Sequence, residues 1–329
     1  MPRLCLILLF LLLPLLGKGQ PAQRACMFWN VENLFDCRHD TLKHDQEFLP
    51  DAERGWSPWR YWRKLDALSR TLAAVADAEG DWPMLVGLAE VENDSVLRDL
   101  TRRSPLRQAG YRYVMTDSPD ERGVDVALLY QPERFRLTGW HAVGIPSREN
   151  GFRPTRDLLY ATGEVAPGDT LHILVVHLPS RAGNRRGSGL HRQLAVERLR
   201  QTVDSLSGRP LLVMGDFNSE AGDRIFRRLC PPLVSLMPHG KAMRRARGTY
   251  VYQGRWSFLD HMLCSPALQA RMDAPARVVA FPFMLDEKGR PARTFLGPIY
   301  KGGYSDPLPV ICSLAGLLPQ GGGENSRWR

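Results

Sequence analysis

The sequence Leu211-Leu212-Val213-Met214-Gly215-Asp216-Phe217-Asn218 joins a short apolar run to the polar tetrapeptide Gly-Asp-Phe-Asn. The apolar run predicts a buried strand, and the carboxyl end of such a strand is where ligands bind in layered α/β folds. Because Asp216 and Asn218 are two residues apart on an extended segment, they point to the same face, where a base and an amide donor can meet one phosphate. An isolated tetrapeptide of this kind is more typical of a turn in which Asp and Asn serve the backbone. The other strand ends must therefore decide between the two interpretations.

Strand-like runs recur along the chain, with helices between some of them. The runs lie at 25–29, 84–89, 111–115, 124–130, 158–165, 171–177, 211–214, 258–264 and 308–314. The first helix is predicted from Ser57 as N-cap and Pro58 at the first helical position. A second helix is expected over about 189–206, and a shorter third helix follows Ser219. This succession predicts an α/β (α+β) fold in which two packed, mostly antiparallel sheets have helices outside.

Both longer helices carry an apolar stripe that we expect to pack against the core. The stripes comprise Trp62, Leu65, Leu68, Leu72 and Val75 in the first helix, and Leu190, Leu194, Leu199 and Val203 in the second. The length admits one large domain or two of average size. Since no Pro/Ser/Gly-rich linker interrupts 24–318, we expect a single domain there, followed by a disordered tail at 319–329.

The amino-terminal segment is typical of a secretory signal peptide. Arg3 precedes an apolar run from Leu4 to Leu16, which is shorter than the roughly 20 residues that cross a bilayer. A lipoprotein signal is disfavoured, because Cys5 lies inside the run and Cys26 follows no small apolar triplet. We therefore expect residues 1–20 to be removed, and the mature protein to be secreted or periplasmic without stable insertion into a membrane.

Charge and cysteine content restrict the function less sharply. The formal net charge is +9, and nearly all the positively charged side chains are arginines. This basic balance permits a polyanionic substrate without requiring one. The five cysteines beyond the signal segment are odd in number and widely spaced, which argues against a disulfide framework or a zinc site, although one bridge stays open. Cys26, Cys264 and Cys312 lie in β-like runs and are expected to be buried. The oligomeric state is not indicated.

Polar side chains gather at the predicted strand ends. They are Asn30, Glu32, Glu90, His177, Asp216, Asn218, Asp260 and Asp306. So many carboxylates would repel one another unless neutralised, and carboxylate and amide oxygens are the ligands of a hard cation such as Mg²⁺.

Seven motifs in order carry a family resemblance. They are WNVEN (29–33), LAEVEN (88–93), RGVDVALLY (122–130), HLPSR (177–181), MGDFNSE (214–220), SFLDHML (257–263) and GGYSD (302–306). Together they resemble the endonuclease/exonuclease/phosphatase superfamily, which includes deoxyribonuclease I, in the form of an exported bacterial-type member. The resemblance covers 25–314 and implies a four-layer αββα sandwich that hydrolyses phosphoesters with Mg²⁺, or alternatively Mn²⁺.

The resemblance also implies a metal site. Glu90 matches the principal metal ligand, and Glu32 would hold the metal directly or through water. Asn30 would steady this cluster. Asp306 would complete the acidic group next to the metal, and in the family it precedes a histidine.

Four further residues match catalytic positions of the family. Asp216 would orient or deprotonate the attacking water, and Asn218 would donate to a phosphate oxygen. His177 would lie near the leaving group. Asp260 matches the aspartate that orients a second histidine.

That second histidine is absent. The family pattern is Ser-Asp-His, whereas this chain has Ser305-Asp306-Pro307. Proline can neither transfer a proton nor donate a hydrogen bond, and loss of a positioned acid or base typically costs about 10²- to 10⁴-fold in rate. His261 is adjacent to Asp260 on a strand and should point to the opposite face, so we expect it to have a structural role.

A basic loop follows His177. It carries Arg181, Arg185, Arg186 and Arg192 among glycines. A solvated surface and a phosphate-binding loop are nearly equal interpretations, and we take Arg181 and Arg186 as candidate substrate ligands.

Three functions stay open from the sequence. The first is an exported Mg²⁺-dependent phosphodiesterase or nuclease, slowed by Pro307, with nucleic acid as a candidate partner. The second is a catalytically silent phosphate-binding relative. The third is a phosphomonoesterase or lipid phosphodiesterase that uses the same site.

Overall fold

The computed structural model describes residues 24–180, 188–238 and 247–315. The predicted signal segment 1–20, the tail 319–329 and the candidate substrate ligands Arg181 and Arg186 lie outside these ranges, so they stay predictions.

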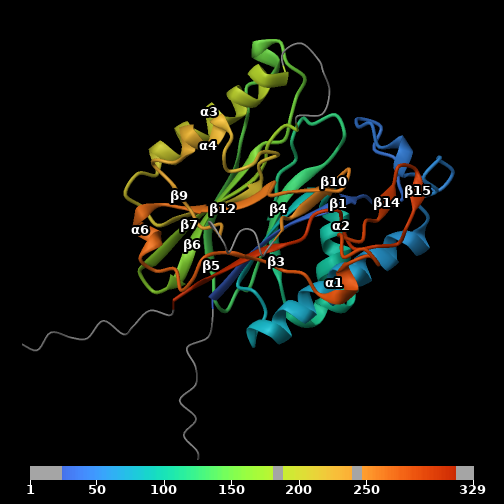
Figure 1. The fold of residues 1–329 in the computed structure, drawn as a ribbon, viewed down its shortest axis with the longest axis horizontal. Helices are drawn as coiled ribbons and strands as arrows, with labels where there is room; N and C mark the ends of the chain where they lie inside the picture. The colour runs from blue at the N-terminus through green and yellow to red at the C-terminus, as the bar shows by residue number, and fades with distance from the viewer. Residues whose placement is uncertain (1–23, 181–187, 239–246, 316–329) are drawn as a thin grey trace, which may run out of the picture.

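Two six-stranded sheets form the centre of the fold (Figure 1). The first has the order β13-β16-β1-β2-β4-β3 and comprises β1 (Arg24–Leu34), β2 (Leu85–Val91), β3 (Arg112–Met115), β4 (Asp125–Tyr130), β13 (Arg277–Val278) and β16 (Val310–Leu314). The second has the order β5-β6-β7-β8-β12-β9 and comprises β5 (Arg136–Val143), β6 (Leu158–Ala166), β7 (Asp169–His177), β8 (Leu211–Asp216), β9 (Val234–Ser235) and β12 (Asp260–Cys264). Each sheet contains one parallel pair, β1 with β2 and β7 with β8, and its other pairs are antiparallel. The prediction of two mostly antiparallel sheets is confirmed.

Helices cover the outer faces of both sheets (Figure 1). The helices of the described residues are α1 (Pro58–Glu79), α2 (Asp94–Arg98), α3 (Ser188–Ser205), α4 (Arg224–Leu229) and α6 (Pro266–Gln269), with short turns η1 (Gln46–Phe48), η2 (Asp99–Arg103), η3 (Pro105–Ala109), η4 (Arg148–Asn150) and η5 (Pro282–Met284). The start of α1 is as predicted: Ser57 accepts a hydrogen bond from the Arg60 amide at 3.4 Å, and Pro58 opens the helix.

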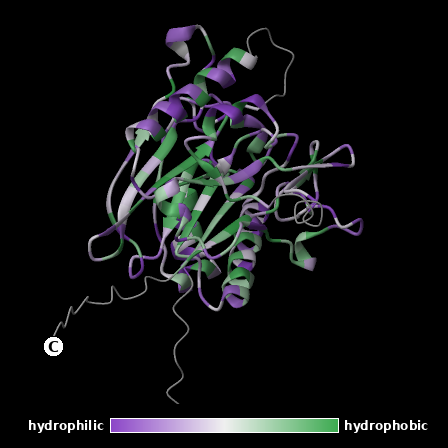
Figure 2. Cartoon of the chain, turned by 60° about the vertical axis from the view of Figure 1, so that its left-hand side comes forward, coloured by the Kyte–Doolittle hydropathy of each residue, from purple (hydrophilic) through white to green (hydrophobic). Residues whose placement is uncertain are grey.

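Apolar side chains form three layers, because successive residues of a strand face opposite sides of its sheet. Met27 on β1 packs with Leu65 of α1 on the outer face of the first sheet. Its neighbour Phe28 packs between the two sheets. Leu199 of α3 covers the outer face of the second sheet. In Figure 2 the central strands are largely hydrophobic, whereas the helices around them mix hydrophilic and hydrophobic residues. This is the four-layer αββα sandwich that the resemblance implied.

The stripe predicted for α3 is wrong at its first member. Leu190 is 61% exposed, whereas Val196, Leu199 and Val203 are buried. At 3.6 residues per turn, Leu190 lies about half a turn around the helix from Leu199, so both cannot face the sheet. The stripe of α1 is confirmed. Its buried members are Leu65, Leu68, Leu72 and Val75, and Trp62 is partly buried.

Sequence patterns missed several strands that lack regular alternation. The edge strand β5 is largely exposed. Two hairpins were also missed: β10 (Tyr250–Tyr252) with β11 (Arg255–Ser257), and β14 (Phe295–Leu296) with β15 (Ile299–Tyr300). Both hairpins border the candidate site.

The five cysteines within the described ranges are free, and Cys26, Cys264 and Cys312 are buried as predicted. Among the helices of the described residues, none is both long and apolar enough to cross a membrane.

Candidate active site

The two parallel strand pairs end at one place, where the sheets meet. Asn30 at the end of β1 donates from Nδ2 to Oδ2 of Asp216 at the end of β8, at 3.1 Å. Nε2 of His177 on β7 lies 4.0 Å from Oε1 of Glu90 on β2. Both contacts join one sheet to the other, and a cavity of about 970 Å³ opens there.

All eight polar residues predicted at strand ends line this cavity. They are Asn30, Glu32, Glu90, His177, Asp216, Asn218, Asp260 and Asp306, and Pro307 lines it as well. The structure therefore brings together side chains from β1, β2, β7, β8 and its following turn, the start of β12, and the segment before β16. We refer to this cavity as the cleft.

The backbone is strained at three of these residues. Glu32, Glu90 and Asn218 have positive φ values of 51°, 64° and 49°, a region that residues with a Cβ seldom adopt. The register of β1 with β2 shifts between Asn30 and Leu34, and that of β2 with β4 shifts between Ala89 and Val91. Bulges of this kind redirect side chains next to active sites. They explain why these glutamates leave the strand pattern and face the cleft.

Backbone amides hold the two glutamates. Oε2 of Glu32 accepts from the amide of Thr294 at 2.7 Å, and Oε1 accepts from the amide of Phe295 at 3.3 Å. Oε2 of Glu90 accepts from the amide of Asn33 at 2.9 Å, with Arg122 Nη2 3.7 Å away. Their carboxylates are thus oriented before any ligand binds.

Asp216 is fixed on both oxygens. Oδ1 accepts from the amide of Asn218 at 2.8 Å, while Oδ2 accepts from Asn30. Burial raises the pKa of Asp216 to about 6, and the nearby charge of Glu90 acts in the same direction. The Asn218 side chain donates to the carbonyl of Leu178 at 2.9 Å, which ties the turn after β8 to the end of β7.

His177 is a neutral imidazole. It is buried, its Nε2 lies 3.8 Å from Oδ2 of Asp216, and its Nδ1 has no hydrogen-bond partner among the described residues. Burial, together with the charges of Arg156 and Arg122, lowers its pKa well below the usual value. A neutral imidazole can donate one N–H to a phosphoryl oxygen.

No imidazole among the described residues pairs with Asp260. Both its carboxylate oxygens are buried without a hydrogen-bond partner, and it lies opposite Asp216 in the register of β12 with β8. Burial and the charge of Asp216 raise its pKa well above the usual value. His261 points to the other face, as predicted, and its Nε2 lies 2.8 Å from the carbonyl of Ser219.

The resemblance implied that Asp306 lies next to a metal, and the structure gives this carboxylate an arginine as its partner. Its Oδ2 accepts from Nη2 of Arg293 at 2.6 Å. This ion pair competes with direct ligation of a metal by Asp306.

Several polar residues of the site were missed from the sequence. Arg122, Tyr250 and Arg293 line the cleft from loops and a hairpin that carry no periodic pattern. Lys64 on α1 lies beneath it, fully buried, with Nζ 2.5 Å from Thr294 Oγ1 and 2.5 Å from the carbonyl of Tyr304. Burial lowers its pKa to about 8. Lys64 directly precedes Leu65 of the apolar stripe, and a charged side chain at such a position is a sequence signal that could have identified it.

The donor set fits a hard divalent cation. Among the described residues, no three His, Cys, Asp or Glu side chains are grouped closely enough to enclose a metal by themselves. Mg²⁺, however, is usually held by one or two carboxylates together with water and substrate phosphate. Burial is the main cause of the raised pKa of Asp216, and the charge of Glu90, which acts in the same direction, is what a cation would neutralise.

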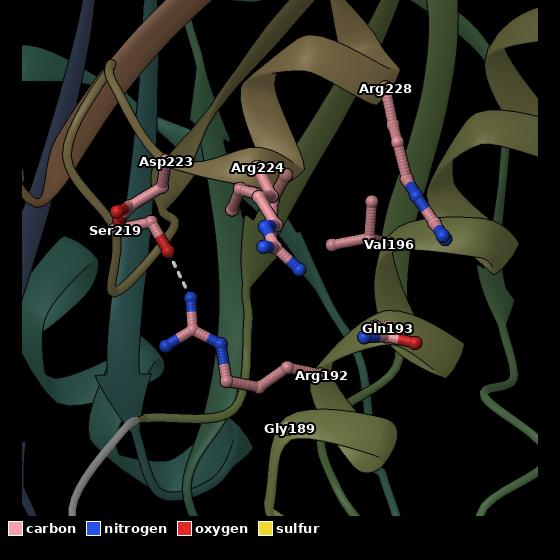
Figure 3. Close-up of a pocket in the computed structure, with 9 residues that line it drawn as sticks. Gly189, Arg192, Gln193, Val196, Ser219, Asp223, Arg224 and Arg228 are labelled. Carbon is pink, nitrogen blue, oxygen red and sulfur yellow. Dashed lines mark hydrogen bonds between the residues drawn. The ribbon is translucent and has the colours of Figure 1, made fainter.

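A second cavity, of about 380 Å³, lies between α3 and α4 (Figure 3). Arginines rather than a carboxylate cluster dominate it: Arg192, Arg224 and Arg228 line it together with the single acid Asp223. Arg192, which the sequence placed in a candidate phosphate-binding loop, is buried and donates to the carbonyl of Asn218 at 3.1 Å and to Ser219 Oγ (Figure 3). It supports the turn after β8 from outside the cleft.

Comparison with known proteins identifies the fold and the family. A model of the Endonuclease/Exonuclease/phosphatase family matches residues 25–316. The human nocturnin catalytic domain with bound sulfate is 18% identical, with a TM-score of 0.53 over 91% of this chain and 96% of that one. TDP2 from D. rerio, complexed with single strand DNA product, is 15% identical, with a TM-score of 0.54 over 89% and 99%. A mannosyl-6-phosphatase from Bacteroides thetaiotaomicron is 14% identical, with a TM-score of 0.51 over 88% and 99%. No curated protein sequence matches the chain.

The match to the family extends over most of the chain, and the fold agrees with it. The protein belongs to the Endonuclease/Exonuclease/phosphatase family. Membership supports hydrolysis of phosphoesters, and enzymes of this family generally depend on a divalent metal.

Proposed function

We propose that this protein is a Mg²⁺-dependent phosphodiesterase, with nucleic acid as its candidate substrate. The observation that carries the proposal is the convergence of Glu32, Glu90, His177 and Asp216 from both sheets on one cleft. The relatives with similar folds support the reaction class, since one is complexed with single strand DNA product and another is a phosphatase.

Each residue of the cleft has a role that follows from its environment. Glu32 and Glu90 would hold the cation, which when bound neutralises charge on the phosphoryl oxygens. With its pKa of about 6, Asp216 is largely ionised at neutral pH and accepts a proton from the attacking water. His177 donates an N–H to a phosphoryl oxygen, and Asn218 offers the amide hydrogen that its bond to Leu178 leaves over.

The test is cleavage of plasmid DNA and bis-(p-nitrophenyl) phosphate with Mg²⁺ or Mn²⁺. Asp216→Asn and Glu90→Gln should each lower kcat/KM by about 10²-fold or more while the protein stays folded. Glu133→Gln is the matched control, because Glu133 is an exposed acid outside the cleft. Equal activity of Asp216→Asn and wild type would show that any cleavage comes from elsewhere.

The same assay separates the alternative functions. Preference for p-nitrophenyl phosphate over the diester would indicate a phosphomonoesterase, and preference for a phospholipid would indicate a lipid phosphodiesterase. Inactivity on every substrate, with phosphate binding retained, would indicate a silent relative in which Pro307 has abolished catalysis.

We further propose that the protein acts outside the cytoplasm. The support is the apolar run from Leu4 to Leu16 after Arg3. Fractionation of expressing cells and amino-terminal sequencing of the product test this, and an uncleaved product in the cytoplasm would contradict it.

A further inference from the structure

One wall of the cleft is crowded with acids and has an apolar residue where a polar group is expected. Asp216, Asp260 and Asp306 line this wall together with Pro307. The Pro307 carbonyl accepts from Nε1 of Trp29 at 3.0 Å, and its ring has no donor to offer. A phosphate that entered here would meet like charges unless a cation stood beside them.

Arg293 supplies a cation at this wall. It comes from the segment before β14, lines the cleft and donates to Asp306 Oδ2 at 2.6 Å. Its guanidinium lies 5.8 Å from the ring centre of Tyr250, and the backbone of Tyr250 forms a bridge with Pro307. The side chain is one-third exposed, at 34%, so a ligand in the cleft can reach it. The bond to Asp306 uses one of five N–H groups.

The backbone around Arg293 is fixed from several directions. Glu32 accepts from the next two amides along the chain, and the Arg293 carbonyl accepts from the amide of Gly303 at 3.1 Å. A Cβ at Gly303 would lie only 2.4 Å from that carbonyl oxygen, so this close approach requires glycine. Lys64 binds Thr294 from below. Such supports hold a charged side chain ready for its ligand.

The other arginines of the cleft have other positions or tasks. Arg122 lies 3.7 Å from Glu90 and donates to Asn33 Oδ1 at 2.7 Å. Arg156 is buried between Asp120 and a backbone carbonyl. Arg54 pairs with Glu47 and a backbone carbonyl, and Arg153 lies 3.9 Å from Glu121. Arg293 is therefore the arginine that stands with Asp306 and Pro307.

We infer that Arg293, positioned by Asp306, binds a non-bridging oxygen of the scissile phosphate and so takes over the phosphate contact that Pro307 cannot make. This inference rests on the proposed function. Arginine stays protonated, so it stabilises negative charge but gives no proton to a leaving group. The enzyme should consequently prefer diesters with acidic leaving groups, such as p-nitrophenolate, over those that leave as alkoxides.

The experiment compares wild type with Arg293→Ala, Arg293→Lys, Pro307→His and the double variant Arg293→Ala/Pro307→His. Arg293→Ala should lower kcat/KM for bis-(p-nitrophenyl) phosphate about 10²- to 10³-fold. Arg293→Lys should recover part of this loss. In the double variant the introduced imidazole should restore hydrolysis of bis-(p-nitrophenyl) phosphate. Pro307→His alone should reduce the difference in rate between diesters with acidic leaving groups and diesters that leave as alkoxides. Arg136→Ala is the control, since it breaks an ion pair of the same length, 2.6 Å, that joins the edge strand β5 to Glu164 on β6.

Calorimetric binding of inorganic phosphate with Mg²⁺ gives a readout that needs no turnover. Arg293→Ala should weaken it about tenfold or more, and the double variant should regain it. If Arg293→Ala binds phosphate and turns over like wild type while Asp216→Asn is dead, the inference is overturned and the proposed function stands. If no variant hydrolyses any substrate but Arg293→Ala alone loses phosphate binding, the proposed function fails, and the inference that rests on it is reduced to phosphate binding by Arg293. Failure of the double variant to recover would mean that Arg293 supports the fold, which overturns the inference.

Discussion

Acidification should destabilise the protein through the buried imidazole of His261. Its Nε2 lies 2.8 Å from the carbonyl of Ser219 and 3.0 Å from that of Phe258, so this nitrogen carries the proton and donates to both. Nδ1 is buried without a hydrogen-bond partner among the described residues, and the rings of Phe217 and Phe226 lie against the imidazole. A second proton would create a buried, unpaired charge. Burial therefore lowers the pKa of His261 from 6.5 to about 4.

The size and sign of the effect follow from these two pKa values. As pH falls, the unfolded chain takes up the proton near pH 6.5, but the folded chain does so only near pH 4. Between pH 6.5 and about pH 4 the unfolded state binds more protons than the folded state. The free energy of unfolding therefore decreases as the pH is lowered through this window. At about 1.4 kcal/mol per pH unit, the full loss is about 3 kcal/mol and is complete below about pH 4.

Urea unfolding of wild type and His261→Gln, from about pH 7 to about pH 4, measures this loss. The glutamine amide can still donate to the carbonyls but does not titrate in this range. The variant starts from a lower stability, but its curve should fall about 3 kcal/mol less across the window. His141→Gln, an exposed histidine on β5, should follow wild type. Parallel curves for wild type and His261→Gln would refute the reasoning, because the acids that also titrate are common to both proteins.

Three further predictions concern the core and the supports of the site. Lys64→Met removes the buried ammonium and leaves two oxygen acceptors unpaired, so unfolding in denaturant should show a loss of about 1–3 kcal/mol, with reduced activity; unchanged activity would show that the segment before β14 does not need this support. Leu72→Ala in the outer apolar layer should cost about 2–5 kcal/mol, whereas Leu190→Ala on the exposed side of α3 should stay within about 0.5 kcal/mol by the same measurement. Similar losses for the two would contradict the assigned faces. Arg192→Met should lower kcat about 10- to 100-fold with little change in substrate preference, because it removes a support of the turn after β8; a steady-state assay that shows wild-type kcat would rule out this role.

The arrangement of the acids was predictable because strand ends impose it. Asp216 and Asn218 follow a four-residue apolar run. Glu90 and His177 likewise each follow an apolar run that predicts a buried strand. Strand alternation points Asp216 and His177 toward the cleft, whereas Glu90 at its bulge and Asn218 with its positive φ depart from that alternation. Once two parallel pairs place their carboxyl ends together, these side chains must meet.

The residues that complete the cleft were not predictable by the same means. Arg293 and Tyr250 lie in or next to short hairpins, where no periodic pattern marks the direction of a side chain. Their position depends on long-range contacts, such as the amides around Thr294 that bind Glu32 and the close approach of Gly303. The expected stripe of α3 failed at Leu190 although a helical pattern was present. The spacing of its leucines was compatible with two faces of the helix, and the face that packs against the sheet is the one with Leu199 and Val203.

The strained backbone at Glu32 and Glu90 bears on whether the cleft works or has fallen silent. A left-handed conformation costs a residue with a Cβ of the order of 1 kcal/mol or more, and glycine or asparagine would relieve most of it. This chain has asparagine at two of the four such positions in the cleft, 33 and 218, but glutamate at the other two. The buried Glu32 and the half-buried Glu90 contribute little to stability in these strained conformations that smaller residues would not. Under the proposed function, this conformational cost is retained because the two carboxylates hold a cation against a phosphoester. The replacement of one histidine by Pro307 is therefore better explained by a rearranged phosphate contact at Arg293 than by loss of the active site.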